Sequence, residues 1–199
     1  MTVKSRAEKM GETRAKLIAA ARQAFATKGY AAASMDDLTA DAGLTRGALY
    51  HNFGDKRGLL AAVVDQIDSD LAQKAKAVGE AAGGGWQGLM AEGRAYIRMA
   101  LEPEVQRIVL LDGPAVLGDP SQWPSQNRCL EATITTLREL HSQQLIKDAD
   151  IEAVARLLNG MALNAALWVA SAEDPDATLP KAVAAFECLA AGILAHGQA

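Results

Sequence analysis

The segment from Ser34 to Lys56, SMDDLTADAGLTRGALYHNFGDK, constrains the fold more strongly than any other part of the chain. Ser34 can cap a helix, and Asp37 adds a negative charge near the start of that helix. Gly43 tolerates the positive φ at which a helix ends, and Thr45 can cap the next helix. The segment therefore predicts two short helices joined by a tight turn, a helix-turn-helix whose second helix can enter a major groove of DNA.

The outward positions of the second predicted helix suit contacts with DNA. Arg46 is a long donor that can reach guanine edges, while Gly47 and Ala48 let the backbone approach closely. The polar residues that follow offer donors to phosphate oxygens. Phe53 is expected in the core, whereas the hydroxyl of Tyr50 fits a phosphate. The predicted DNA-binding residues are Ser34, Thr45, Arg46, Gly47, Ala48, Tyr50, His51, Asn52 and Lys56.

A further helix is predicted upstream. Leu17, Ile18, Ala21 and Phe25 recur at helical spacing. Gly29 follows at the position where a helix commonly ends. Three helices in this region make a small bundle, and the third is the predicted recognition helix.

Together these motifs resemble the N-terminal domain of the TetR (tetracycline-repressor) family of bacterial transcription regulators. The resemblance spans roughly residues 10–60 and rests on Ala21, Phe25, Lys28-Gly29-Tyr30, Asp37-Leu38, the run from Ala42 to Tyr50, Phe53, Lys56 and Leu59-Leu60. It implies an all-α homodimer with a variable, ligand-sensing C-terminal domain. It also implies that Thr45, Arg46, Gly47 and Ala48 approach bases while Tyr50, His51 and Lys56 hold the DNA backbone. The chain departs from the family at Asn52, where His is common, and at Met35-Asp36.

Charge is divided unevenly along the chain. The net charge of the whole chain is −4. Residues 1–57 hold ten basic and six acidic residues, a net of +4, and the remainder holds ten and eighteen, a net of −8. A basic head on an acidic body directs the head toward phosphate.

Other sequence features indicate where in the cell the protein acts and whether it uses disulfides or metals. No run of 18 or more apolar residues suggests a membrane span, and the polar N-terminus lacks the apolar segment of a signal peptide, so a cytoplasmic protein is expected. Cys129 and Cys188 are too few for a disulfide framework and are expected to be reduced. His51, His141 and His196 give no metal-ligand spacing, so neither a metal nor a cofactor is expected.

The rest of the pattern is helical, without strand alternation or an internal repeat. A long helix is expected from Lys56 to near Gly79, followed by a loop at Gly83-Gly84-Gly85. Further helices are expected from Trp86 to Leu101, from Pro103 to Gly118 with an interruption at Asp112-Gly113-Pro114, over 125–146 with His141 on its apolar stripe, from Asp150 to Ser171, and from Leu179 or Pro180 to near His196. At 199 residues and 50% hydrophobic, the chain is expected to be all-α with about nine helices. Residues 1–57 would form the helix-turn-helix bundle and 58–199 a helical ligand-binding and dimerisation domain.

The last predicted helix is apolar on nearly every side and needs cover on two sides. A second copy of the chain is the expected cover, giving a homodimer through the last two helices. The expected seam pairs Ala182, Ala185, Leu189 and Ile193 with Ala162, Ala166 and Ala170. A helix buried wholly inside one subunit is the alternative. Two heads related by a two-fold axis would read a palindrome.

Polar and aromatic residues within the apolar stripes of the body suggest an effector pocket between helices. Each could instead belong to the core, and Asp112 could simply cap or turn the chain. The candidates are Tyr96, Met99, Asp112, Trp123, Asn127, His141, Met161, Asn164 and Trp168.

The main functional hypothesis is a repressor that leaves a palindromic operator when it binds a small, mainly apolar or aromatic effector. A DNA-binding protein without an effector is the first alternative. An all-α enzyme or small-molecule carrier is the second, and against it the sequence offers no nucleophile-base pair, metal constellation or phosphate loop.

Overall fold

The computed structural model describes residues 5–195, and this part of the chain contains nine α-helices, which confirms the expected all-α fold. They are α1 (Arg6–Ala32), α2 (Met35–Asp41), α3 (Arg46–Phe53), α4 (Lys56–Ala81), α5 (Gly85–Arg98), α6 (Gly113–Leu117), α7 (Pro124–Ser142), α8 (Ile151–Ser171) and α9 (Pro175–Ala191). A π-helical segment, η2 (Val105–Asp112), leads into α6. Short 3-10 turns cover Met99–Leu101 and Pro120–Gln122.

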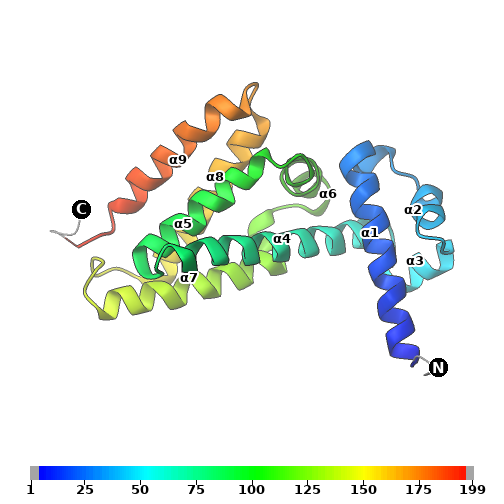
Figure 1. The fold of residues 1–199 in the computed structure, drawn as a ribbon, viewed down its shortest axis with the longest axis horizontal. Helices are drawn as coiled ribbons and strands as arrows, with labels where there is room; N and C mark the ends of the chain where they lie inside the picture. Colours follow the sequence, from blue (N-terminus) through cyan, green and yellow to red (C-terminus); the bar gives the residue numbers. More distant parts are fainter. Residues whose placement is uncertain (1–4, 196–199) are drawn as a thin grey trace.

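Helices α1, α2 and α3 form a head at one end of the molecule, and α4 runs from this head along the body (Figure 1). The predicted caps of the helix-turn-helix are confirmed. Ser34 Oγ accepts the backbone N–H of Asp37 at 3.0 Å, and Thr45 Oγ1 accepts that of Ala48 at 3.2 Å. Gly43, with φ of 64°, makes the turn between α2 and α3.

A kink in α1 lets the body pack against the head. Gly29 has φ of 79° and ψ of 163°, so the helix breaks where the sequence predicted, but it resumes as far as Ala32. A Cβ atom on Gly29 would lie 2.0 Å from Nη2 of Arg107 on η2. The guanidinium of Arg107 could move aside, but the backbone conformation of Gly29 is one that other residues rarely adopt, so the kink depends on glycine.

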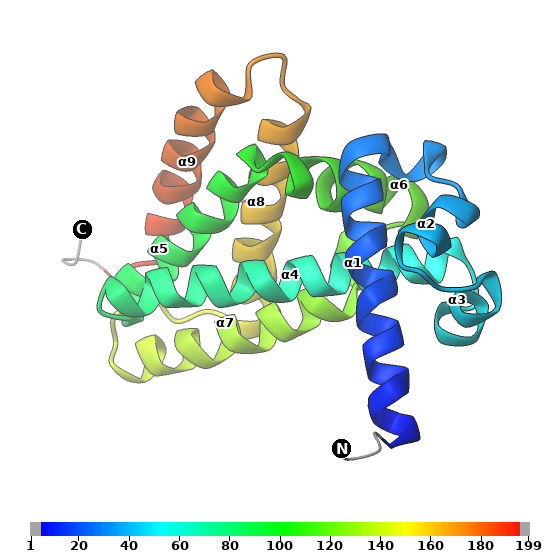
Figure 2. The same ribbon diagram turned by 45° about the vertical axis from the view of Figure 1, so that its right-hand side comes forward.

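Helix α4 joins the head to the core of the body. Leu60, Val64, Ile67 and Leu71 are buried along it, as the helical spacing predicted. In Figure 2, α4 lies between α5 and α7 and reaches the head beside α1. A change in the packing of the body can therefore reach the head through a single rigid element.

Three predicted boundaries are wrong. Helix α9 begins at Pro175, after the cap Asp174, and Pro180 lies inside it. An Asx cap followed by proline is a strong start signal, and the exposed position of Pro180 leaves the unpaired carbonyl one turn earlier open to water. Helix α9 ends at Ala191, before the expected end near His196, which itself lies outside the described residues. The expected helix over 125–146 ends at Ser142, because Gln144 adopts φ of 57°.

The predicted interruption at Asp112-Gly113-Pro114 is also wrong, because the backbone stays helical from η2 into α6. Pro114 stands in the first turn of α6, where its missing N–H is not needed. A Cβ atom on Gly113 would lie 2.8 Å from the Trp123 ring. Gly113 therefore serves close packing rather than a break in the helix.

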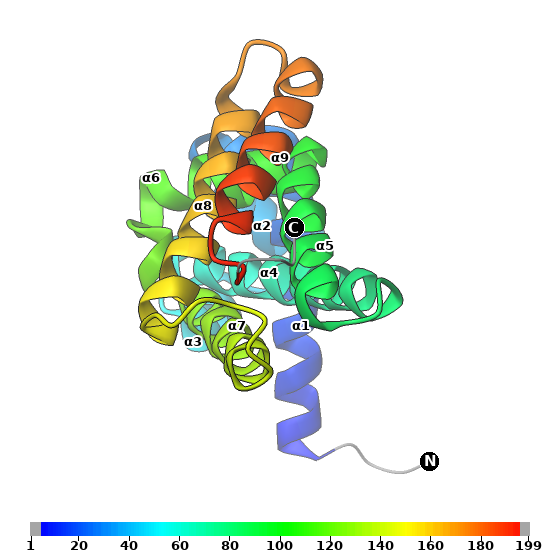
Figure 3. The ribbon, with the colours of Figure 1, turned by 90° about the vertical axis from the view of Figure 1, so that its left-hand side faces the viewer.

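Helices α8 and α9 lie side by side on the body (Figure 3). Helix α8 also packs against α5 and α7. By length and composition alone α8 could cross a membrane, a test that core helices of globular proteins also pass. Its cap, Asp150, accepts the N–H of Ala153 at 2.8 Å, as predicted.

Candidate nucleic-acid interface

Helix α3 presents one exposed face. Leu49 is buried against the head, whereas Arg46, Gly47 and Tyr50 are exposed. A Cβ atom on Gly47 would meet only Thr45 Oγ1, at 3.7 Å, so the space outside Gly47 is open. Thr45, Arg46, Gly47, Tyr50 and His51 all lie exposed, with Ala48 half-buried between them.

Arg46 has a partner within the head. Its guanidinium donates two hydrogen bonds to the carboxylate of Asp36, at the start of α2. The hydrogen bond to Arg46 lowers the pKa of Asp36. Both side chains are more than half exposed, so water and phosphate can compete for the pair.

Two predicted DNA contacts are engaged inside the protein. The Asn52 side-chain amide donates to the carbonyl of Ala48 at 2.8 Å. Lys56 Nζ lies 4.4 Å from the centre of the Tyr30 ring and 3.4 Å from the carbonyl oxygen of Ala31. Burial lowers the pKa of Lys56. Each group still has a further N–H that could donate to phosphate, because an amide nitrogen carries two donors and an ammonium three.

Several hydrogen bonds tie the head to the body, and two sets of them involve η2 and α6. Asp112 Oδ2 accepts the backbone N–H of Tyr30 at 2.8 Å. Arg57, in the first turn of α4, donates to the carbonyl oxygens of Val116 and Leu117 at 3.3 and 3.4 Å. The segment formed by η2 and α6 therefore contacts the end of α1 and the beginning of α4.

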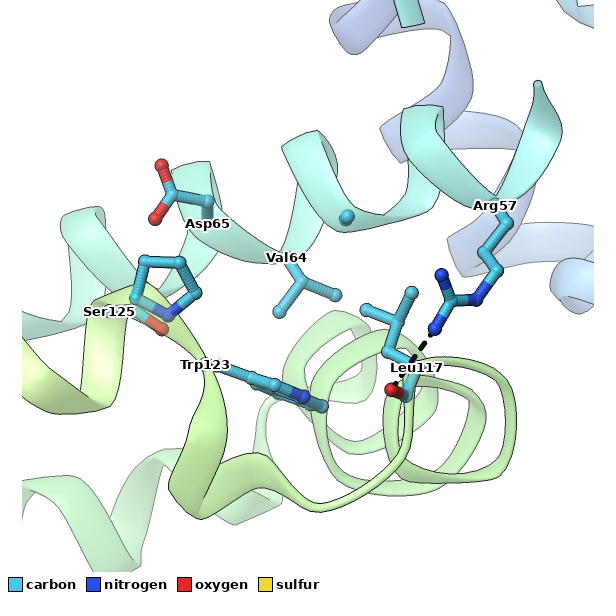
Figure 4. Close-up of a pocket in the computed structure, with 8 residues that line it drawn as sticks. Arg57, Val64, Asp65, Leu117, Trp123 and Ser125 are labelled. Carbon is cyan, nitrogen blue, oxygen red and sulfur yellow. Dashed lines mark hydrogen bonds between the residues drawn. The ribbon is translucent and has the colours of Figure 1, made fainter. Parts of the chain in front are cut away.

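A groove of about 190 Å³ lies on the body beside Arg57 (Figure 4). The Trp123 ring forms one wall, with Val64 and Leu117 around it. The groove is lined by Arg57, Ala61, Val64, Asp65, Leu117, Trp123, Pro124 and Ser125. It thus borders both α4 and the carbonyl group of Leu117 that Arg57 contacts.

The structure does not gather the nine effector candidates into one site. Trp123 lines the groove, and Met99 and the hydroxyl of Tyr96 are buried inside the body. Asp112 contacts the head, as described above. Asn127 is exposed on α7, as is His141, whose Nε2 lies 3.3 Å from Asp148 Oδ1, so the expected inward position of His141 is wrong. The line Met161, Asn164 and Trp168 lies on the outer face of α8.

A buried polar cluster that the sequence reading missed lies between α4, α5 and α7. Asp68 is only 5% exposed, and its Oδ2 accepts the hydroxyl of Ser125 at 2.5 Å. Asp68 Oδ1, the Tyr96 hydroxyl and Trp123 Nε1 are buried without a hydrogen-bond partner. The sequence could have predicted the burial of Asp68, because it follows Val64 by four residues and precedes Leu71 by three, which places it on the buried face of α4. Over residues 5–195, no group of three or more His, Cys, Asp or Glu side chains could hold a metal ion.

The head is a small helical bundle that exposes the second helix of a helix-turn-helix, and it is joined to a helical body. This architecture is that of the helix-turn-helix DNA-binding regulators. Residues 17–63 match the family described as bacterial regulatory proteins, tetR family. Residues 86–193 match the family described as tetracyclin repressor-like, C-terminal domain. The chain belongs to the TetR family and is a DNA-binding transcriptional regulator.

Similar proteins agree with this assignment. A TetR-family transcriptional regulator from Pectobacterium atrosepticum has a crystal structure with a TM-score of 0.86 and 51% identity, covering 96% of this chain and 98% of that one. The transcriptional repressor AcnR of Corynebacterium jeikeium is 29% identical over 75% of this chain and 77% of its own length. The regulator TtgR of Pseudomonas putida is 42% identical over 60 residues, 30% of this chain and 29% of its own length. These relatives are transcription regulators rather than enzymes, and regulators of this family bind DNA operators and small-molecule effectors and act as dimers.

Proposed function

We propose that this protein is a cytoplasmic homodimeric repressor that binds a palindromic operator and leaves it when a small effector binds the body. The observation that supports this most strongly is the exposed face of α3, which combines a long donor, a glycine and polar side chains. We place the boundary between the DNA-binding domain and the effector domain after residue 57, at the start of α4. Arg46 would read a base, and Tyr50 and His51 would hold phosphates.

The outer faces of α8 and α9 fit a second copy of the chain. Leu157, Met161, Asn164 and Trp168 recur at helical spacing on α8, and Trp168 is 49% exposed. On the neighbouring α9, Leu189 is 64% exposed. Large apolar side chains at this density mark an interface, and a two-fold partner would cover both helices and pair the two heads.

The groove supports an effector response. An apolar effector held between Val64, Leu117 and Trp123 would lie beside the bonds that Arg57 makes to α6. Moving α6 or α4 would change the angle of the head, so that two heads no longer match successive major grooves. Spin-label distances between the two α3 helices, measured with and without effector, test this; an unchanged distance contradicts it.

Selection from random duplex DNA tests the DNA-binding role and supplies the operator. Arg46→Ala should weaken specific binding by roughly tenfold to a hundredfold and relax base preference at one position in each half-site. Lys56→Ala should weaken all sequences alike and reduce the salt dependence. If Arg46→Ala still prefers the same DNA sequence as the wild type, Arg46 does not contact a base.

A further inference from the structure

The buried carboxylate of Asp68 has no cation to balance it. Oδ1 has no hydrogen-bond partner and Oδ2 accepts the Ser125 hydroxyl, while the nearby Gln126 amide, which also lowers the pKa of the group, carries no charge. Burial raises the pKa of Asp68. A carboxylate in such a place is unfavourable unless a charge or several hydrogen bonds compensate it.

The charged and titratable groups around Asp68 do not supply that compensation. Asp65, on the same helix, adds a like charge. Arg128 of α7 is nearby, but its guanidinium pairs with Asp65 at 2.7 Å and its side chain is 54% exposed. Tyr96 of α5 and Cys129 of α7 are uncharged, because burial and the Asp68 carboxylate raise both of their pKa values. Gln126 of α7 contributes an amide without charge.

The same place is equipped for an organic cation. The Trp123 ring forms one wall of the groove, and the face of an aromatic ring attracts ammonium groups. Ser125 contacts Asp68 and also lines the groove. Asp68 does not line the groove itself, so a molecule whose apolar part fills the groove reaches Asp68 by placing its polar end past Ser125.

We infer that the effector is an amine, whose protonated nitrogen pairs with Asp68 while its apolar or aromatic part lies in the groove against Trp123. The inference rests on the proposed effector response and names the chemical class of the effector. A neutral hydroxyl could donate one hydrogen bond to Oδ1, but only a cation also offsets the buried negative charge. The body, with its net charge of −8 from ten basic and eighteen acidic residues, also favours a cation over an anion.

Three probes of one shape test the charge requirement on the full-length protein. They are phenethylamine, the neutral 2-phenylethanol and the anionic phenylacetate, each followed by thermal shift and titration calorimetry. Phenethylamine should raise the melting temperature most and bind at least about tenfold more tightly than the alcohol. Equal or tighter binding of either other probe, or no shift with phenethylamine at about 10 mM, overturns the inference.

Asp68→Asn is the informative variant, because asparagine keeps the shape and removes the charge. Glu80→Gln is the control, since Glu80 is an exposed acid on the same helix that does not line the groove and pairs with Lys76. Asp68→Asn should lose about tenfold or more of its affinity for phenethylamine and keep that for the alcohol, while Glu80→Gln keeps both. Amine affinity retained in Asp68→Asn overturns the inference. If Asp68→Asn fails to fold, the comparison of the three probes on the wild-type protein still tests whether the effector must carry a positive charge.

Operator binding by the same proteins separates this inference from the proposed function. Without a probe, Asp68→Asn should bind the selected operator as the wild type does. An amine that binds through Asp68 without releasing the operator supports the amine site and contradicts the effector response. Release of the operator by neutral compounds alone supports the response and overturns the amine site.

Discussion

The carboxylate of Asp36 at the start of α2 holds the guanidinium of Arg46 at the start of α3 through two hydrogen bonds. The pair joins the two helices of the helix-turn-helix across their outer surface. Guanine presents two acceptors to the same guanidinium in the major groove. In the free protein, Asp36 therefore occupies the donors that α3 would offer to a base.

Asp36→Asn should strengthen operator binding by about threefold, because an exposed ion pair that competes with DNA is lost and a negative charge near phosphate is removed. Fluorescence anisotropy with operator DNA measures this. Asp41→Asn is the control, since Asp41 is an exposed acid at the other end of α2. An equal gain in both variants would assign the effect to net charge alone.

Asp112→Ala should destabilise the protein by about 1–3 kcal/mol, because the N–H of Tyr30 loses its acceptor where the head meets the body. Asp112→Asn keeps an acceptor oxygen and should lose clearly less. Chemical denaturation compares the two variants. Equal losses would show that the charge of Asp112, opposite Arg107 at 3.3 Å, matters more than the hydrogen bond to Tyr30.

Gly29→Ala should destabilise the protein by about 1–3 kcal/mol, since φ of 79° with ψ of 163° is a conformation that only glycine adopts readily. Gly11→Ala is the control on the same helix, where a Cβ atom would meet nothing within 4 Å, and it should be neutral or stabilising. Thermal unfolding distinguishes them, and similar melting temperatures would contradict the strained backbone at Gly29.

The stability of the protein should depend on the ionisation of Asp68. Its pKa is raised in the folded state by burial and by Asp65, against the opposing effects of Ser125, Gln126 and Arg128. The stability linked to this carboxyl group is therefore full at pH values below its unfolded pKa of about 3.9 and is lost as the pH rises through the folded pKa.

Asp68→Asn should consequently gain stability relative to the wild type as the pH rises above the unfolded pKa of about 3.9. Denaturant unfolding at several pH values measures the difference. Glu80→Gln, at an exposed acid near the end of α4, should leave the slope of the pH dependence close to that of the wild type. A difference between Asp68→Asn and the wild type that stays constant with pH would contradict a raised pKa for Asp68.

Leu189→Glu should convert the proposed dimer into single subunits, because it places a charge in the apolar centre of the α8–α9 face. Val78→Glu is the matched control, since Val78 is exposed on α4. Analytical ultracentrifugation measures the mass in solution. A Leu189→Glu protein that remains dimeric would move the interface away from this face of α9.

Sequence alone determined the features whose causes are local. Ser34, Thr45 and Asp150 cap helices because a short polar side chain satisfies N–H groups two or three residues away. The exposed face of α3 and the buried stripe of α4 follow from helical periodicity, which a single segment contains in full.

Only the tertiary structure decided which faces meet. Asp112 contacts Tyr30 across 82 residues of sequence, and no local pattern reports that distance. Met161, Asn164 and Trp168 have the spacing of an inner stripe, yet Asn164 and Trp168 are exposed and Met161 is only half-buried, because the alanines of α8 occupy the contact with its neighbours. In the sequence, Asp68 is one of several polar residues of α4. Only the fold brings Ser125, Tyr96 and Trp123 near it. Periodicity assigns residues to a face of a helix, but packing between distant helices determines whether that face meets water, the core or a ligand.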